Sequence, residues 1–181
     1  TPKTYFSFTS ESALENIEKV GYPLVIKPVI GSWGRGVMQV KDKDTADALF
    51  EIRDITDSPH DRIFYLQELI KRPPRDIRVI TVGDEPIAAM YRKSSGGFKT
   101  NIALGADPEL CEITKEIEEI STKASKAMGG GILGIDIMED EKRGLVVHEV
   151  NNTVEFKGLA RVSRRNIPKE MVEFALNYVR K

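Results

Sequence analysis

The spacing of apolar positions near the start of the chain predicts alternating helices and strands. Residues 11–20 carry apolar side chains at helical spacing, and Gly21 follows as a C-terminal stop. Three short apolar runs are typical of strands, and they cover residues 24–29, 37–41 and 63–70. Asp44 is expected to cap a helix that carries Ala48, Leu49 and Ile52. This part of the chain therefore predicts one α+β lobe.

The segment Lys71-Arg72-Pro73-Pro74 interrupts this pattern and predicts a boundary between two lobes. We place the first lobe at residues 1–72 and the second at residues 73–181. The second lobe opens with DIRVITV and PIAAMYRK, which flank Gly83-Asp84 and predict a β-hairpin.

Asp107-Pro108 predicts the start of a long helix, because a capping carboxylate precedes a proline at the first helical position. The apolar stripe of this helix is expected to be Ile113, Ile117, Ile120, Ala124 and Ala127. Gly129-Gly130-Gly131 ends it, and the strands GILGIDIME and LVVHEVN follow. A last helix carries Val172, Ala175, Leu176 and Val179. The predicted fold class is α+β in two lobes.

Composition removes several classes of function. The 181 residues include 27 basic and 28 acidic side chains, and this formal charge of -1 argues against a general nucleic-acid binder. No run approaches the roughly 18 apolar residues of a membrane span, and nothing resembles a signal peptide. Cys111 is the only cysteine, which excludes an intrachain disulfide and, with two histidines, argues against a structural zinc site. We expect a cytoplasmic protein.

The last two predicted strands bring together candidate metal ligands. Glu149 and Asn151 share one strand face, and a loop of residues 141–144 sets Asp136 opposite Glu149. Opposed side chains have Cβ atoms about 4.5–5.5 Å apart, so two carboxylates there repel unless a proton or cation lies between them. Two carboxylates and an amide oxygen suit Mg²⁺ bound jointly with phosphate. The alternative is a solvated strand face with incidental charges.

The loop at residues 31–36 carries three glycines, whose backbone N–H groups can converge on an anion. Lys27 lies inside the preceding apolar strand, where a lysine must extend to water or meet an anion, and phosphate would supply that partner. Trp33 within the loop is either a lid or a packed hairpin tip.

The segment Gln67 to Ile70 ends a strand at the lobe boundary, a usual place for a ligand cleft. Its backbone groups are candidates for contact with an adenine edge. Asp76 and Arg78 share a strand face, and a structural ion pair between them is the alternative to a role in binding.

These motifs, in the order TPKT, VIKPVIGSWGRGV, LQELI, RDIRV, GIDIM and HEVNNTVEF, resemble the ATP-grasp superfamily. Within it the chain looks closest to the LysX/ArgX-type ligases, relatives of RimK. The resemblance implies an ATP-grasp fold, with two α+β lobes and the nucleotide cleft between them. It also implies a ligase that uses ATP and Mg²⁺ in lysine or arginine biosynthesis. Such an enzyme activates the C-terminal glutamate carboxylate of a small acidic LysW-type carrier protein as an acyl phosphate. It then joins that group to the amino group of glutamate or α-aminoadipate.

The resemblance also implies roles for individual residues. The residues expected to contact ATP are Lys27, Gly31, Ser32, Trp33, Gly34, Arg35, Gly36, Val37, Gln67, Glu68, Leu69, Ile70, Asp76, Arg78 and Asn101. Those expected to line the substrate site are Arg92, Ile102, Ala103, Glu155, Phe156, Lys157, Gly158 and Leu159. The expected magnesium ligands are Asp136, Glu149 and Asn151. Arg92 is the expected catalytic residue, beside the acyl phosphate. A homo-oligomer is expected.

The sequence departs from this family in two places. The domain that normally precedes TPKT, and that supplies one more phosphate-contacting lysine, is absent from this chain. Residues 159–165 differ from the LysX pattern, so the choice between glutamate and α-aminoadipate stays open. We hypothesise that residues 155–165 make this choice through the basic side chains Lys157, Arg161, Arg164 and Arg165. The alternative is that these side chains are solvated or pair with the acidic carrier.

Three other interpretations fit parts of the sequence. A different RimK-like ligase would add glutamate to a ribosomal-protein tail or to a coenzyme. An isolated nucleotide-binding module or inactive fragment would keep the fold without the reaction. A metal-free interpretation treats Asp136 and Glu149 as surface charges. His60 and His148 are expected to be structural or solvated.

Overall fold

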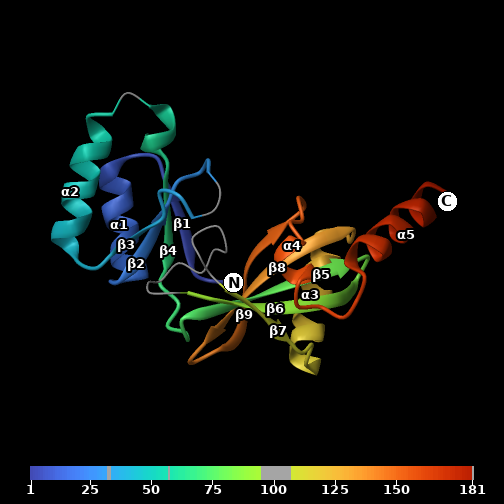
Figure 1. Cartoon of the computed structure of the whole chain (residues 1–181). Coiled ribbons are helices and arrows are strands. Elements are labelled where there is room, and N and C mark those ends of the chain that lie inside the picture. The colour runs from blue at the N-terminus through green and yellow to red at the C-terminus, as the bar shows by residue number, and fades with distance from the viewer. Residues whose placement is uncertain (32–33, 57, 95–106, 181) are drawn as a thin grey trace. The chain divides into compact units, whose positions relative to one another are not determined.

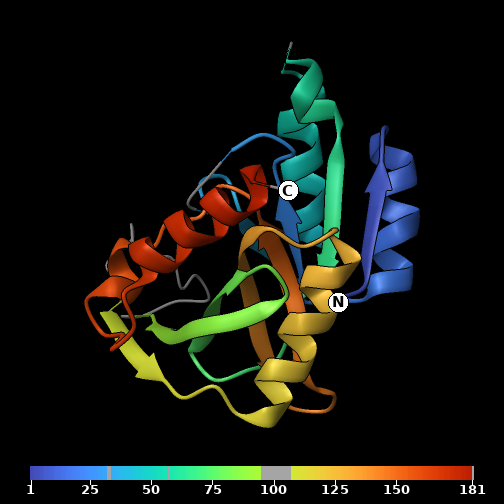
Figure 2. The same ribbon diagram turned by 90° about the vertical axis from the view of Figure 1, so that its right-hand side faces the viewer.

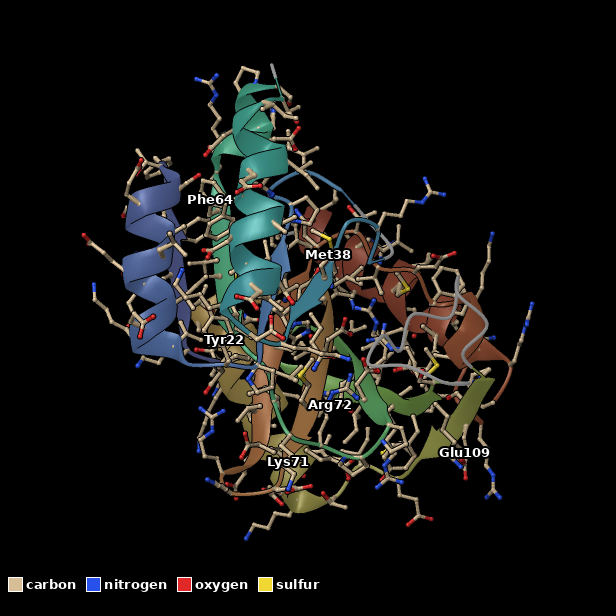
Figure 3. The ribbon with its side chains drawn as sticks, turned by 90° about the vertical axis from the view of Figure 1, so that its left-hand side faces the viewer. Tyr22, Met38, Phe64, Lys71, Arg72 and Glu109 are labelled. Atoms are coloured by element: carbon tan, nitrogen blue, oxygen red, sulfur yellow. The ribbon has the colours of Figure 1, made fainter. Side chains whose placement is uncertain are left out.

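The chain forms two compact units, each with its own β-sheet, in a computed structural model that describes residues 1–31, 34–56, 58–94 and 107–180 (Figure 1). We call Pro2–Ile70 the N-terminal unit and Lys71–Lys181 the C-terminal unit. The division falls beside the Lys71–Pro74 segment, where the sequence predicts a boundary; Lys71 and Arg72 are labelled in Figure 3. Among the described residues, no helix is both long and apolar enough to cross a membrane.

The N-terminal unit is an antiparallel sheet of four strands with two helices packed on one face (Figures 1 and 2). In sheet order the strands are β1 (Thr4–Ser7), β4 (Phe64–Glu68), β2 (Leu24–Lys27) and β3 (Met38–Val40). The helices are α1 (Ser10–Val20), α2 (Lys43–Asp54) and the short 3-10 helix η1 (Pro59–Arg62). Helices α1 and α2 bury Ile17 and Phe50 against Ile26, Phe64 and Leu66 of the sheet. The predicted helix over residues 11–20 is confirmed, with Gly21 after its last turn.

The start of helix α2 lies two residues earlier than the sequence predicts. Asp42, and not Asp44, is the N-cap, because its Oδ1 accepts hydrogen bonds from the Thr45 backbone N–H at 2.8 Å and from Thr45 Oγ1 at 2.6 Å. This cap directs Ala46 and Phe50 inward at helical spacing. Ile52, an apolar residue of the predicted helix, is 61% exposed.

The C-terminal unit is an antiparallel sheet of five strands with a core on each face. In sheet order the strands are β7 (Asp107–Cys111), β6 (Glu85–Lys93), β5 (Arg75–Val82), β8 (Ile132–Asp140) and β9 (Gly144–Asn151). Helix α3 (Lys115–Ala127) packs its Ile117 on the face that carries Ile77, Ile135 and Ile137. Helices α4 (Lys157–Ala160) and α5 (Ile167–Val179) pack Leu159 and Ile167 against the opposite face.

The prediction that Asp107-Pro108 begins a helix is wrong. These residues lie in β7, which pairs with β6 at the edge of the sheet. Proline lacks a backbone N–H, and an edge strand accepts it because one side of the strand has no ladder to complete. The helix begins later, where Thr114 caps it by accepting a hydrogen bond from the Ile117 backbone N–H at 3.3 Å. The predicted hairpin at Gly83-Asp84 is confirmed, since Val82 pairs with Glu85.

The cap of α3 predicts a measurable stability difference. Thr114→Ala leaves an N-terminal backbone N–H of the helix without its side-chain acceptor, so the free energy of unfolding should fall by about 1 kcal/mol. Thr114→Ser keeps the acceptor and should change it little. Urea unfolding of both variants checks this, and equal losses would mean that the hydroxyl does not cap the helix.

Candidate functional site

Strands β8 and β9 set two carboxylates side by side, as the sequence predicts. Asp136 pairs directly with Glu149, and Gly134 pairs with Asn151 on the next step of the same face. Asp136 is 6% exposed, whereas Glu149 is exposed to solvent. The predicted arrangement of two carboxylates and one amide on one strand face is therefore present.

The route to this register differs from the prediction. Asp140 pairs with Gly144, so the connecting loop has residues 141–143 and is one residue shorter than expected. If the two strands continued from this pair without a bulge, Asp136 would lie opposite His148. A bulge between Asp136 and Ile137 absorbs the extra residue and restores the pair with Glu149. A β-bulge thus decides which side chain of β9 meets Asp136.

A buried network of charges continues along the same face. The Arg92 guanidinium on β6 donates to Asp76 of β5 through Nε at 2.6 Å and Nη2 at 2.9 Å. The same Nη2 lies 3.0 Å from Asp136 Oδ2, and Arg78 Nε lies 3.1 Å from Asp136 Oδ1. Asp76, Arg92 and Asp136 are each at most 6% exposed. The structure thus pairs Asp76 with Arg92 and Arg78 with Asp136, in place of the Asp76–Arg78 pair that the sequence left open.

Burial and charge act against each other in this network. Burial raises the pKa of Asp136, and the Arg92 and Arg78 guanidiniums oppose that effect. Burial lowers the pKa of Arg78 despite its carboxylate partners. Burial also acts to lower the pKa of Arg92, but Asp136 and Asp76 outweigh it and hold this pKa above its usual range. Arg92, with two carboxylate partners, is therefore the most firmly charged member.

The oxygen donors present fit a hard cation. Asp136 Oδ1 is buried and has no hydrogen-bond partner among the described residues, although Arg78 Nε lies near it. Asp136 pairs with Glu149 and lies beside Asn151, and carboxylate and amide oxygens are the ligands that Mg²⁺ takes in proteins. In the described part of the chain, no group of three or more His, Cys, Asp or Glu side chains could hold a metal. The candidate site has two carboxylates and an amide, so it does not depend on such a group.

Lys27 and the glycine loop belong to the N-terminal unit. Lys27 is the last residue of β2 and is half-buried, with its Nζ 5.5 Å from the centroid of the Tyr65 ring. In the loop, Gly34 and Gly36 both have φ of 70°, a backbone conformation that favours glycine. A Cβ on Gly36 would lie 3.2 Å from Pro28 Cγ. The loop is therefore built for close backbone approach.

Some predicted site residues cannot be placed. Those outside the described residues are Ser32, Trp33, Asn101, Ile102 and Ala103. Arg35 is exposed and Val37 donates its backbone N–H to Gly34 O at 3.4 Å.

The predicted adenine segment has structural side chains at its start. Gln67 is buried and donates from Nε2 to Thr4 Oγ1 at 2.9 Å, and Glu68 Oε1 accepts from the Lys3 backbone N–H at 2.7 Å. Both bonds join the TPKT segment to β4. Contact between adenine and the backbone of Leu69 and Ile70 stays a prediction.

The predicted amino-acid segment is partly structural. Leu159 is wholly buried against Ile80 and Met90, so it holds α4 to the sheet and presents no surface to a substrate. Glu155 and Lys157 are exposed, while Phe156 and Gly158 are half-buried. The Arg165 guanidinium lies 2.6 Å from Glu170 and 3.3 Å from Glu85. One of the four basic side chains hypothesised to hold a substrate carboxylate is therefore already paired with carboxylates of the chain.

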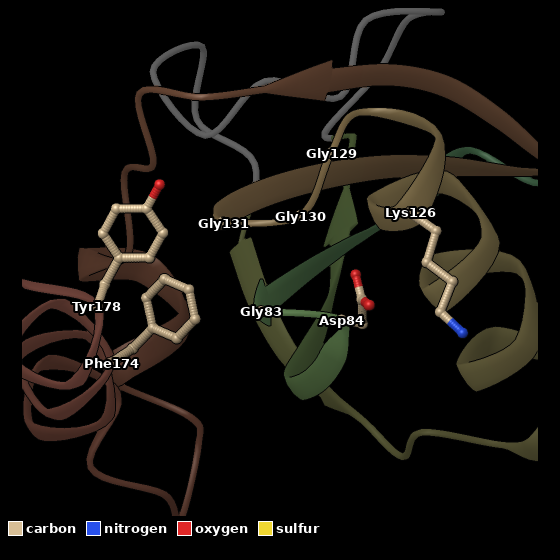
Figure 4. A pocket seen from close by; sticks show the side chains of 8 residues that line it. All are labelled: Gly83, Asp84, Lys126, Gly129, Gly130, Gly131, Phe174 and Tyr178. Atoms are coloured by element: carbon tan, nitrogen blue, oxygen red, sulfur yellow. The ribbon is translucent and has the colours of Figure 1, made fainter. Parts of the chain in front are cut away.

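A cavity of about 680 Å³ lies at the other end of β5 from Asp76 (Figure 4). Phe174 and Tyr178 of α5 line one side, and Gly83, Asp84, Lys126 and Gly129–Gly131 complete it. It contains none of the residues that the sequence assigns to a site.

Comparison with protein families identifies the chain. The model of the RimK-like ATP-grasp domain matches residues 1–175. The chain belongs to the RimK-like ATP-grasp family. The predicted ATP-grasp fold is confirmed by this match. A solved structure, a RimK-domain ATP-grasp protein from Sphaerobacter thermophilus, superimposes with a TM-score of 0.74 at 21% identity. The alignment covers 96% of this chain and 61% of that one.

Curated relatives of this ATP-grasp chain are longer ligases. It is 41% identical to the alpha-aminoadipate–LysW ligase LysX of Sulfurisphaera tokodaii, across 99% of this chain and 63% of the relative. It is 33% identical to the glutamate–LysW ligase ArgX of Sulfolobus acidocaldarius, across 97% and 63%. It is 37% identical to a tetrahydromethanopterin:alpha-L-glutamate ligase of Methanocaldococcus jannaschii, across 99% and 62%. The chain thus spans less than two thirds of the length of these relatives.

The charge network predicts unequal effects for two neighbouring arginines. Arg92→Met leaves the buried carboxylates of Asp76 and Asp136 without their shared partner, and the free energy of unfolding should fall by about 3–5 kcal/mol. Arg75→Met is the comparison, because Arg75 pairs with Glu139 at 2.7 Å in a part-exposed position and leaves a single, more accessible carboxylate, so its loss should be clearly smaller. Denaturant unfolding measures both losses, and similar values would contradict the buried network.

Proposed function

We propose that this chain is the ATP-grasp part of an ATP- and Mg²⁺-dependent carboxylate–amine ligase. The observation that supports this most is the buried Asp136 in register beside Glu149 and next to Asn151, with an Oδ1 that makes no hydrogen bond among the described residues. Membership of the RimK-like ATP-grasp family supports the use of a nucleotide there. In this proposal Asp136, Glu149 and Asn151 hold Mg²⁺, which supplies charge neutralisation at the ATP phosphates.

In this proposal the side chains and backbone of the chain position ATP and the substrates and neutralise the charge of the phosphates. Lys27 contacts the ATP phosphates, and the glycine loop covers them with backbone N–H groups. A substrate carboxylate attacks the γ-phosphate to give an acyl phosphate and ADP, and the amino group of the second substrate then displaces phosphate to form an amide. Arg92, held charged by Asp76 and Asp136, stabilises the acyl phosphate. No covalent nucleophile is needed, because phosphoryl transfer depends on positioning and electrostatic stabilisation.

In this proposal the substrates are those in the names of the LysX and ArgX relatives. The amine is α-aminoadipate or glutamate, and the carboxylate is the C-terminal glutamate of a LysW-type carrier protein. The higher identity to LysX, 41% against 33% for ArgX, favours α-aminoadipate. A homo-oligomeric state and a cytoplasmic location stay predictions.

A second candidate acts on a small molecule. The 37% identity to a tetrahydromethanopterin:alpha-L-glutamate ligase favours glutamate transfer to a coenzyme carboxylate. The metal and phosphate residues are the same in both candidates, so only the acceptor distinguishes them.

The deciding experiment measures ADP formation by the whole protein with ATP and Mg²⁺. α-Aminoadipate and glutamate are each supplied with a LysW-type carrier, with a coenzyme acceptor or alone. The proposal expects multiple turnovers of ADP formation only with carrier and amino acid together, and a higher kcat/KM for α-aminoadipate. Turnover with glutamate and the coenzyme acceptor, but not with the carrier, would identify the coenzyme as the carboxylate substrate. No turnover under any condition would indicate that the chain is a nucleotide-binding module and not a ligase.

Glu149→Ala should abolish turnover while the protein stays folded. Glu149 is exposed, and its removal relieves repulsion from Asp136 before the metal binds. Glu141→Ala, on the loop of the same hairpin, is the matched control and should keep turnover. Normal turnover of Glu149→Ala at moderate Mg²⁺ concentration would remove Glu149 from the metal site.

Lys27→Ala should weaken binding of a non-hydrolysable ATP analogue by about 1.5–3 kcal/mol, the contribution of a hydrogen bond to a charged group. Lys41→Ala, on an exposed position of the same unit, should bind as the unchanged protein does. Calorimetry gives both affinities, and equal values would leave Lys27 with a structural role alone.

A further inference from the structure

The guanidinium of Arg78 approaches strand β8 closely at Gly134. A Cβ built on Gly134 would be 2.7 Å from Arg78 Nη1, 3.5 Å from Cζ and 3.8 Å from Cδ. No ordinary side chain tolerates the shortest of these distances, so Arg78 takes this position because residue 134 is glycine. Gly134 pairs with Ile80 on one side and with Asn151 on the other.

This position puts a cation among the proposed metal ligands. Arg78 Nε lies 3.1 Å from Asp136, and Glu149 also acts on the Arg78 charge. Nη1, over Gly134, lies next to the residue that pairs with Asn151. This nitrogen is buried and makes no hydrogen bond within the described residues. The guanidinium therefore contacts Asp136 and lies within the electrostatic reach of Glu149.

Charges of both signs gather at this face. The carboxylates of Asp76, Asp136 and Glu149 contribute three negative charges. The guanidiniums of Arg78 and Arg92, together with that of Arg72, whose charge acts on Asp76 and Arg92, contribute three positive charges. These charges cancel. A divalent ion alone would turn the face positive, whereas a metal ion that arrives with the phosphates of ATP would not.

We propose that Arg78 is a positioning residue that makes cation binding depend on the nucleotide, and that Gly134 is the residue that lets it do so. Arg78 neutralises Asp136 while no metal is bound and repels a divalent ion that comes without phosphate. The negative charge of the phosphates offsets this repulsion, so metal and nucleotide bind cooperatively. This inference rests on the proposed metal site.

Three substitutions separate the effect of the Arg78 charge from the effect of the guanidinium position. Arg78→Gln removes the charge, and Arg78→Lys keeps it. Gly134→Ala keeps every charged group but displaces the guanidinium, and it should fold, because the atoms that must shift are the end of a flexible side chain. Thermal unfolding of each variant provides the control for folding.

The test is calorimetric titration of the whole protein with Mn²⁺, with and without a non-hydrolysable ATP analogue. The unchanged protein and Arg78→Lys should bind Mn²⁺ alone weakly and much more tightly with the analogue. Arg78→Gln should bind Mn²⁺ alone about tenfold or more tightly than the unchanged protein, because like charges a few ångströms apart repel by at least that factor even near a protein surface. Gly134→Ala should shift in the same direction, and should add nothing in the Arg78→Gln background.

Two results would overturn the inference while the proposed function stands. One is unchanged or weaker binding of Mn²⁺ alone by Arg78→Gln, with normal binding in the presence of the analogue. The other is an additive effect of Gly134→Ala in the Arg78→Gln background. If the unchanged protein bound no Mn²⁺ even with the analogue, the proposed metal site itself would fail and the inference with it.

Discussion

Buried carboxylates on a sheet face need partners, and this requirement governs the C-terminal unit. Asp76 and Asp136 are almost wholly buried, and each lies within 3.1 Å of a guanidinium. Removing Arg92 would take away the bidentate partner of Asp76 and one of the two partners of Asp136, which is far more unfavourable than losing a surface ion pair. The strand registers, the bulges and the glycine under Arg78 all serve to bring these groups together. The same arrangement leaves Asp136 Oδ1 without a hydrogen-bond partner among the described residues, beside an exposed carboxylate.

Two irregularities of the sheet decide which side chains enter the network. The bulge in β9 replaces His148 by Glu149 as the partner of Asp136. A register shift between Ile80 and Thr81 inserts Ile87 into β6, so that Asp76 pairs with Arg92 and not with Tyr91. Both shifts keep the apolar face in place, since Ile77 and Ile137 stay in the core packed under α3. Bulges re-aim side chains without breaking a sheet, and they are common next to functional sites.

Sequence patterns predicted the parts of the structure that local chemistry determines. The helix that ends at Gly21 and the hairpin at Gly83-Asp84 follow from periodicity and turn residues. The facing of Asp136 and Glu149 was also predicted, but the chain reaches it through a shorter loop and a bulge that the sequence pattern does not reveal. The partners of Asp76 and Arg78 were not predicted, because they depend on neighbouring strands and on bulges that periodicity does not reveal. Asp107-Pro108 carries a helix-start signal, but its position on an edge strand outweighs that local preference. An arginine within the apolar run PIAAMYRK was the available sign that a buried carboxylate lies near Arg92.

The central claim is that Asp136, Glu149 and Asn151 hold the metal that accompanies ATP. The most direct measurement is anomalous diffraction from crystals of the whole protein grown with Mn²⁺ and a non-hydrolysable ATP analogue. The account predicts an anomalous peak within about 2.0–2.6 Å of oxygens from all three side chains, the range for hard cations, and beside the phosphates. A peak bound by phosphates and other side chains, with these three residues apart from it, would contradict the account.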